Sequence, residues 1–451
     1  MKKTAAVMLA MIMMLFAMGA LAAVPTVAGA GVSYVYADNV LTLKAAGEYT
    51  VSGWNDGDGV PTAGRIVIQD GVSGSVTLKL EDVHLDAPED YALKWTNNQQ
   101  GVNCTLTVEF ANSSLEGKGG MRVINHLGNA SMTVAGADAM ITGNEYGAVS
   151  VFSGSGSAVV TVSGENASFS GTANGIGSQG QKVTTNVTGA NAMISAEGFG
   201  ISAQSQGDTE VSVTGAGAVV EGNYGIFVDS DGSAAINVEG IKRITAETRG
   251  VSVNAETDTM LNVTDVEEIT STGDFSYAVN AATSGGDMTL NVRNVGKIAG
   301  KSRGLYATSS FGNAQAYVAD VQEIDSDFIG ISVFSQERDS ALTLGGNVTA
   351  TGSEAVMVKT RYGYGTVKLD SENYPGIAAQ LYKNETDEEP EKTLTALNAE
   401  ELEAYHKVRT VLAPKAAGLP RTGDDSQLML YVAMLGIAAA ALLAQRGLRR
   451  E

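Results

Sequence analysis

Apolar residues recur along the middle of this chain with a period of roughly 26 residues, as in proteins built from structural repeats. A small residue opens each unit, and from residue 176 onward an aliphatic residue follows it directly. Self-similarity at such a period is typical of a repeat architecture, in which a unit too short to bury a face by itself packs on its neighbours. The small opening residues are Gly147, Gly175, Gly200, Gly225, Gly250, Ala278, Gly304, Gly330 and Ala355.

Each unit contains two further apolar columns. One follows the first column by about a dozen positions, and the other comes about six positions later in most units. Three short strands per unit, with 54 Gly and 7 Pro in the chain, predict an all-β fold of tight turns. We expect a single-stranded parallel β-helix whose coils bond to one another at a rise of ~4.8 Å. The period extends back to Ile66 and predicts about a dozen three-strand coils over residues 66–370.

Three-strand coils with valine and isoleucine ladders resemble the parallel β-helix of pectin-lyase-type proteins. That resemblance, with the right-handed rule for parallel crossovers, implies a right-handed helix. The segments Gly47–Gly53 and Val76–Leu80 also resemble carbohydrate-binding β-helix modules of clostridial cell surfaces, over residues 38–120. A repetitive solenoid needs protected ends, so we expect an N-terminal β cap at 38–65 and a C-terminal cap at 371–412, followed by a short stalk at 413–418.

The N-terminus has the pattern of a secretory signal peptide. Lys2 and Lys3 precede an apolar run from Ala5 to Ala23 that contains a small-residue cleavage site at 20–22. We expect a signal helix within residues 1–37, with cleavage between 22 and 37. The apolar run is long for a cleaved signal, so an uncleaved membrane anchor is the alternative. With either a cleaved signal peptide or an uncleaved anchor, we expect the rest of the chain to be exported.

The C-terminus combines a short motif, an apolar stretch and a basic end. The apolar residues 428–444 would span roughly 25 Å as a helix, close to one membrane crossing. The arginines at 446, 449 and 450 would hold that end in the cytoplasm. The motif is Leu419, Pro420, Arg421, Thr422 and Gly423.

This order, over residues 419–451, resembles the LPxTG sorting signal of Gram-positive surface proteins. The resemblance implies that a sortase cuts after Thr422 and joins its carbonyl covalently to peptidoglycan, so that the chain is the substrate of that acyl transfer. An ordinary tail anchor is the alternative interpretation. We expect a membrane-inserted precursor and a mature protein in the cell wall.

Charge and cysteine content narrow the classes of partner. The net charge of −21 argues against nucleic acid and other anionic polymers as partners through bulk electrostatics. The single Cys104 alternates with Leu106 and Val108, so we expect a small buried hydrophobic side chain instead of a disulfide.

One column of the second strand is polar in every unit. Alternation predicts that it points to solvent, where hydroxyls and amides at the coil rise could bind an extended polysaccharide. Equally, such a ladder could serve only to solubilise and stack the sheet. On the first strand, Phe227 and Tyr306 point outward and are candidates for sugar contact, whereas Phe199, Tyr224 and Tyr277 share the parity of the inward column. The polar candidates are Thr161, Asn186, Ser212, Asn237, Asn262 and Asn291.

Catalysis is the minority hypothesis. Lyases and hydrolases of the fold that this chain resembles use clustered aspartates, and the hydrolases also carry Gly-His-Gly and Asn-Thr-Asp segments, neither of which occurs here. Asp82 and Asp86 flank His84, for which an exposed loop is the simpler interpretation. We therefore expect no catalytic residues, and the protein is predicted not to be an enzyme.

We expect no cofactor, with calcium as the alternative. Two Gly-bearing turns place carboxylates two residues apart, Asp56 with Asp58 and Asp229 with Asp231, a spacing that hard cations accept. Asp and Gly are also common turn residues for conformational reasons alone. The function that we expect is binding or adhesion, first to a carbohydrate. The alternatives are a structural or host-protein-binding adhesin without a glycan site and, third, a polysaccharide lyase or hydrolase.

Overall fold

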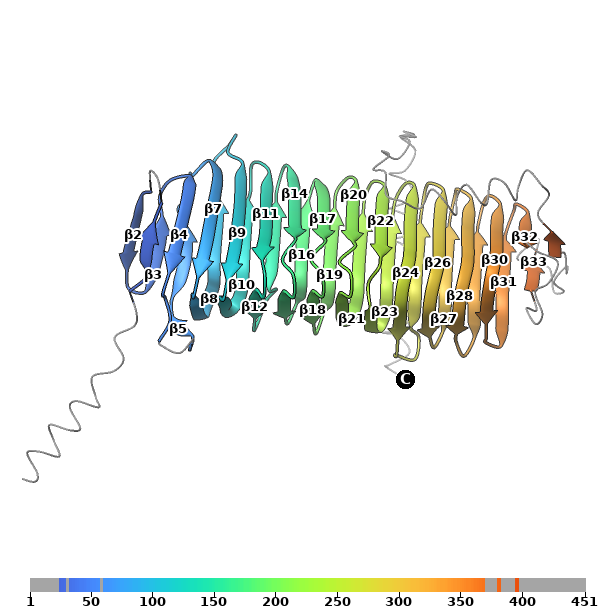
Figure 1. Cartoon of the computed structure of the whole chain (residues 1–451). Helices are drawn as coiled ribbons and strands as arrows, with labels where there is room; N and C mark the ends of the chain where they lie inside the picture. Colours follow the sequence, from blue (N-terminus) through green and yellow to red (C-terminus); the bar gives the residue numbers. More distant parts are fainter. Residues whose placement is uncertain (1–23, 30–31, 57–59, 370–378, 383–393, 397–451) are drawn as a thin grey trace, which may run out of the picture. The chain divides into compact units, whose positions relative to one another are not determined.

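The computed structural model describes residues 24–29, 32–56, 60–369, 379–382 and 394–396. These residues form an all-β parallel β-solenoid of the right-handed type with about 12 turns (Figure 1). They contain 34 strands and no helix. The predicted fold class is confirmed for this part of the chain, while the expected signal helix and the segment 428–444 lie outside the described residues.

Successive coils stack their strands into three parallel stacks. Stack A is built from the first strand of each coil, where Phe199 of one coil is in register with Tyr224 of the next. Its members are β3 (Val40–Leu43), β6 (Arg65–Ile68), the second halves of β8 (His84–Asn97) and β10 (Ser114–Asn125), β13 (Val149–Ser153), β16 (Asn174–Gly180), β19 (Phe199–Ser205), the second halves of β21 (Val219–Ser230) and β23 (Arg243–Ala255), β25 (Tyr277–Thr283), β27 (Arg303–Ser309), β29 (Ile329–Ser335), β31 (Glu354–Thr360) and β33 (Ala379–Tyr382).

Stack B is built from the second strands. It contains β4 (Gly47–Ser52), β7 (Gly74–Glu81), β9 (Cys104–Ala111), β11 (Ala130–Gly136), β14 (Ser157–Val162), β17 (Lys182–Val187), β20 (Thr209–Val213), β22 (Ala234–Glu239), the first halves of β24 (Thr259–Ser271), β26 (Met288–Gly300), β28 (Ala314–Asp325) and β30 (Ser340–Ala350), β32 (Gly365–Leu369) and β34 (Leu394–Ala396).

Stack C is built from the third strands. It contains β5 (Thr62–Ala63), β12 (Met140–Gly143), β15 (Ser168–Gly171), β18 (Met193–Ala196), the first halves of β8, β10, β21 and β23, and the second halves of β24, β26, β28 and β30. The long strands therefore run through a corner from one stack to the next.

The core consists of aliphatic ladders that run along the coil axis. The predicted first column is inward, since Ile201, Ile226 and Val251 have no exposed surface and are in register. The small opening residue is required by packing. A Cβ on Gly225 would lie 2.4 Å from Cγ2 of Ile244 in stack C and 2.5 Å from the carbonyl oxygen of Gly250. The period seen in the sequence is therefore the period of this close approach between stacks A and C.

Cys104 belongs to the same core, as expected. It is 1% exposed and in register with Ala130 of the next coil. Burial raises the pKa of its thiol to about 12, so the thiol stays protonated at neutral pH.

A further column of equivalent residues, which was not predicted from the sequence, forms the corner between stacks B and C. One residue in each coil has the left-handed backbone conformation, which glycine, asparagine and aspartate adopt more readily than other residues. Several neighbouring side chains of this column bond along the axis, as Asn112 Nδ2 does to Asp82 Oδ1 at 3.1 Å and Asn191 Nδ2 to Asn166 Oδ1 at 3.1 Å. The column is Gly53, Asp82, Asn112, Asp138, Asn166, Asn191, Gly217, Gly240, Asp265, Asn294, Asp320 and Gly346.

The N-terminal end is closed by two antiparallel strands. β1 (Thr26–Ala28) pairs with β4, and β2 (Tyr34–Ala37) pairs with β3. The rings of Tyr36 and Trp54 pack edge to face at 5.5 Å between centroids. Strands β3, β4 and β5, within the range expected to form the cap at 38–65, instead pair in parallel with the following coil. The covering role therefore falls to β1 and β2.

The C-terminal described strands continue the same stacks. β33 pairs in parallel with β31, and β34 pairs in parallel with β32. Both lie within the expected C-terminal cap range of 371–412. The rest of that range and the predicted stalk at 413–418 lie outside the described residues.

Candidate functional site

The predicted ligand residues lie on two different faces of the solenoid. Six of them share one register of stack B in consecutive coils, so the predicted polar ladder is continuous. Phe227 and Tyr306 belong to stack A instead. The stack B residues are Thr161, Asn186, Ser212, Asn237, Asn262 and Asn291.

Much of the stack B ladder is engaged within the protein. Asn291 Nδ2 donates to Asn262 Oδ1 at 2.8 Å, and Asn237 Nδ2 donates to Glu239 Oε2 at 3.4 Å. Asn291 is only 5% exposed, so the expectation that this position points freely to solvent is wrong there. The other five residues of the set are half-buried. Amides that bond to one another along the axis stabilise the stacking of coils, and they have fewer groups left for a ligand.

The outer face of stack A carries a ladder of rings and guanidinium groups, here called the aromatic–arginine ladder. The centroids of Phe199 and Tyr224 are 5.1 Å apart, and the Arg249 guanidinium carbon lies 6.0 Å from the Tyr224 ring centre. Arg249 and Arg303 lie 5.5 and 5.3 Å from the Tyr277 ring centre. The ladder consists of Phe199, Tyr224, Arg249, Tyr277 and Arg303, in register in five consecutive coils.

The expectation that the corner rings share the inward parity is wrong. Phe227 lies between two buried residues and faces outward, and its centroid is 5.0 Å from that of Phe199 and 5.5 Å from that of Tyr224. The rings therefore lie on one outer face. Alternation fails because Gly225 and Ile226 are both buried in succession, which shifts the parity by one residue.

Both guanidinium groups of the ladder are fixed by neutral neighbours. Arg249 Nη1 donates to Ser252 Oγ at 3.2 Å, and Arg303 Nη1 donates to the Tyr277 hydroxyl at 3.2 Å. The Arg303 guanidinium carbon also lies 4.2 Å from the Tyr306 ring centre, so that ring is partly covered and is less open to a sugar than the sequence suggested. Arginine over an aromatic face is attracted to the ring electrons. The Nε atoms of Arg249 and Arg303 are buried, so the Nη groups are the ones left for a ligand.

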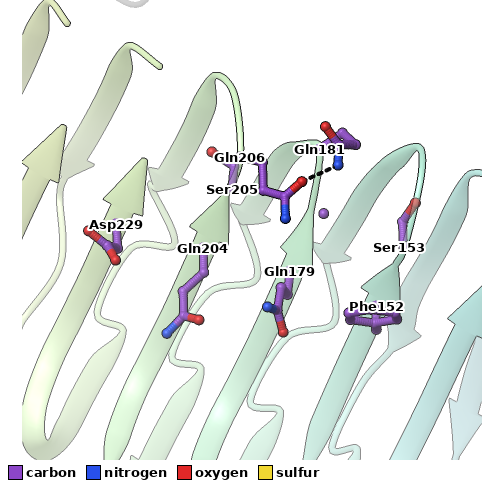
Figure 2. A pocket seen from close by; sticks show the side chains of 10 residues that line it. Phe152, Ser153, Gln179, Gln181, Gln204, Ser205, Gln206 and Asp229 are labelled. Carbon is purple, nitrogen blue, oxygen red and sulfur yellow. Dashed lines mark hydrogen bonds between the residues drawn. The ribbon is translucent and has the colours of Figure 1, made fainter. Parts of the chain in front are cut away.

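A shallow polar depression of about 190 Å³ lies at the opposite end of the stack A strands from the ladder, where stack A turns toward stack B (Figure 2). Phe152, Gln179, Gln204 and Asp229 occupy one outward register in four consecutive coils. Figure 2 shows these side chains in a row, with the hydrogen-bonded pair Gln181 and Gln206 at the turn above them. Together they are called the glutamine depression. The sequence signal was available, because Gln179 and Gln204 hold the same position in consecutive units, but they were not singled out.

The acidic groups at the end of the depression repel one another. Burial and then the charge of Asp231 raise the pKa of Asp229. Burial, followed by Asp231 and Asp229, raises the pKa of Glu256. Among the residues that the structure describes, no group of three or more His, Cys, Asp or Glu side chains could hold a metal ion. For the other predicted turn, Asp56 is described, whereas Asp58 lies outside the described residues.

His84 lies in a strand, not in the exposed loop that was expected. It opens the stack C part of β8 in register with Ser114, and His84 Nδ1 lies 2.8 Å from Ser114 Oγ. His84 Nε2 is 3.6 Å from Asp82 Oδ1, which is beyond hydrogen-bond distance. Asp82 Oδ1 instead accepts from Asn112 Nδ2 in the corner column. The three residue types of a hydrolytic triad thus meet without the bond that would orient the histidine.

No protein-family model, curated protein or solved structure matches the chain. Within the described part of the chain, no helix has the length and hydrophobicity needed to cross a membrane. The sorting motif 419–423 and the apolar stretch 428–444 lie outside that part.

Proposed function

We propose that this chain is a surface protein that a sortase joins to peptidoglycan, and that its solenoid binds a carbohydrate without catalysing a reaction. The anchoring part is supported by sequence order. The motif 419–423 precedes the apolar stretch 428–444, which the basic end follows, and this is the order in which a membrane-held precursor would present Thr422 to a transpeptidase.

The N-terminal strands bear on how the precursor is processed. A cut after Ala37 would remove β1 and β2, and with them the antiparallel cover of the first coil. A cut after Ala22 would retain both strands. Because an uncovered coil end exposes unpaired backbone groups and apolar side chains, we propose cleavage at the earlier site.

The carbohydrate proposal depends on the side chains of the outer face of stack A. Rings, amides and guanidinium groups recur there in successive coils, in the aromatic–arginine ladder and the glutamine depression. A polymer with a regular repeat can meet equivalent groups on successive coils, and side-chain amides suit sugar hydroxyls because they both donate and accept. The half-engaged amides of stack B make that face the weaker candidate.

Alanine at both Gln179 and Gln204 should weaken glycan binding about thirtyfold, since each loses a hydrogen-bonding amide worth about 1 kcal/mol. Binding of the full chain in a neutral detergent would be measured on immobilised plant and host polysaccharides. Asn237→Ala with Asn262→Ala is the matched control on stack B, and it should bind as the unaltered chain does. A loss confined to the stack B variant would place the site on the other face.

A further inference from the structure

Arg249 and Arg303 are cations of this acidic chain that contact aromatic rings and neutral oxygens. Several other basic side chains of the described residues pair with carboxylates, as Arg243 does with Glu221 at 2.6 Å and Lys297 with Glu323 at 3.0 Å. Within the described residues, neither Arg249 nor Arg303 has a carboxylate at ion-pair distance. The net charge of −21 argues against anionic partners only for the surface as a whole. The two guanidinium groups of the aromatic–arginine ladder are a local exception.

The two guanidinium groups are held in place before any ligand arrives. Arg249 lies between the Tyr224 and Tyr277 rings, and Arg303 lies between the Tyr277 and Tyr306 rings. Arg249 also donates from Nη1 to Ser252 Oγ, and Arg303 donates from Nη1 to the Tyr277 hydroxyl. A cation whose side chain is already ordered loses little entropy on binding, and its remaining N–H groups suit a carboxylate.

The spacing of the two cations suggests what they bind. Arg249 is in register with Tyr277, which is in register with Arg303, so the two arginines are two coils and about 10 Å apart along the axis. A sugar in an extended glycan has about the length of one coil rise. Two arginines separated by a tyrosine therefore match acidic groups on alternate sugars, with the intervening sugar beside Tyr277.

We propose that the aromatic–arginine ladder binds an anionic glycan that carries a carboxylate on every second sugar. This proposal rests on the proposed carbohydrate-binding function and specifies its ligand class. The carboxylates lie against the guanidinium groups of Arg249 and Arg303, and the glycan runs along the coil axis. The hydroxyl groups of the bound glycan contact the neutral side chains on the outer face of stack A.

The test uses sodium hyaluronate, which alternates an acidic with a neutral sugar, and the same polymer with its carboxylates converted to methyl esters. Binding to the full chain in a neutral detergent is measured at about 0.15 M salt, where the Debye length of about 8 Å screens the distant acidic surface. We expect at least tenfold tighter binding of the acid than of the ester. This comparison needs no substitution.

The variant Arg249→Gln with Arg303→Gln should lower hyaluronate affinity at least tenfold and bind the ester as the unaltered chain does, because charge-assisted hydrogen bonds are the ones removed. The control Arg243→Gln with Lys297→Gln removes the same charge from stack C and should leave the affinity for hyaluronate unchanged. An unchanged melting temperature establishes that the variants fold.

The outcomes separate the two proposals. Equal binding of acid and ester, or an unaltered affinity in the Arg249 and Arg303 variant, overturns the assignment of an anionic ligand and leaves carbohydrate binding standing. If the chain binds none of the polymers tested, neither hyaluronate nor its ester nor the plant and host polysaccharides, both carbohydrate binding and the ligand assignment are overturned. If the Arg249 and Arg303 variant and the Arg243 and Lys297 control lose the same affinity for hyaluronate, the loss comes from the change in net charge. That result also overturns the assignment of an anionic ligand.

Discussion

Thr422→Ala should abolish covalent attachment of the chain to the cell wall. In the proposed reaction the peptide bond between Thr422 and Gly423 breaks and the carbonyl of Thr422 is joined to an amine of the peptidoglycan precursor. The Thr422 side chain lies directly at this bond, so the transpeptidase must recognise it. In a Gram-positive host with a sortase, the altered chain should remain extractable with the membrane, and the amount released only by digestion of peptidoglycan should fall to background.

Arg421 provides the matched control. It occupies the variable position of the motif, so Arg421→Ala should still be joined to the wall. Pro420→Ala should behave as the Thr422 variant does, because the fixed φ angle of proline shapes the segment that the transpeptidase recognises. A Thr422 variant that still resists extraction with boiling detergent would contradict attachment through Thr422. Extraction of the unaltered chain by boiling detergent would contradict sortase anchoring and favour an ordinary tail anchor.

Ala307→Asp should destabilise the solenoid by about 3–5 kcal/mol at neutral pH, because it leaves an unpaired carboxylate in the core. Ala307 has no exposed surface and lies in register between Ala281 and Val333 of the adjacent coils. Thermal or urea unfolding followed by circular dichroism measures the loss. Thr308→Asp adds the same charge one residue away on the outer face, between Ala282 and Phe334, and should change stability little.

The loss should also depend on pH in a defined direction. Burial raises the pKa of the introduced carboxyl above its value in the unfolded chain. The destabilisation is therefore complete above the folded-state pKa and is relieved as the pH falls through it, because the folded state then holds the proton more tightly. Equal effects of the two variants at neutral pH would mean that residues 307 and 308 do not face opposite sides of a strand.

The sequence predicts the coils and the inward columns because stacking in register forces equivalent positions to carry similar residues. Ile201, Ile226 and Val251 differ little in shape, so a search for like residues at a fixed period finds them. The corner column between stacks B and C was missed because glycine, asparagine and aspartate fill the same backbone conformation and differ chemically.

The aromatic–arginine ladder was missed for a related reason. Tyrosine and arginine attract each other across coils, so the pattern alternates two unlike residue types instead of repeating one. The inward assignment of Phe199 and Tyr224 failed because strict alternation does not hold where two successive buried residues fit between stacks A and C. That close approach depends on Gly225 and its equivalents, which lack a Cβ.

In the parallel stack, residues far apart in sequence lie in one line at the coil rise. Spin labels on the outward register of stack A measure this directly, in a Cys104→Ala background that leaves the introduced cysteines as the only thiols. Positions 179 and 308 are five coils apart and should give one narrow distance of about 24 Å. Positions 179 and 359 are seven coils apart and should give about 34 Å. Distances that do not grow by one coil rise per repeat would contradict the parallel stack and the ligand face built on it.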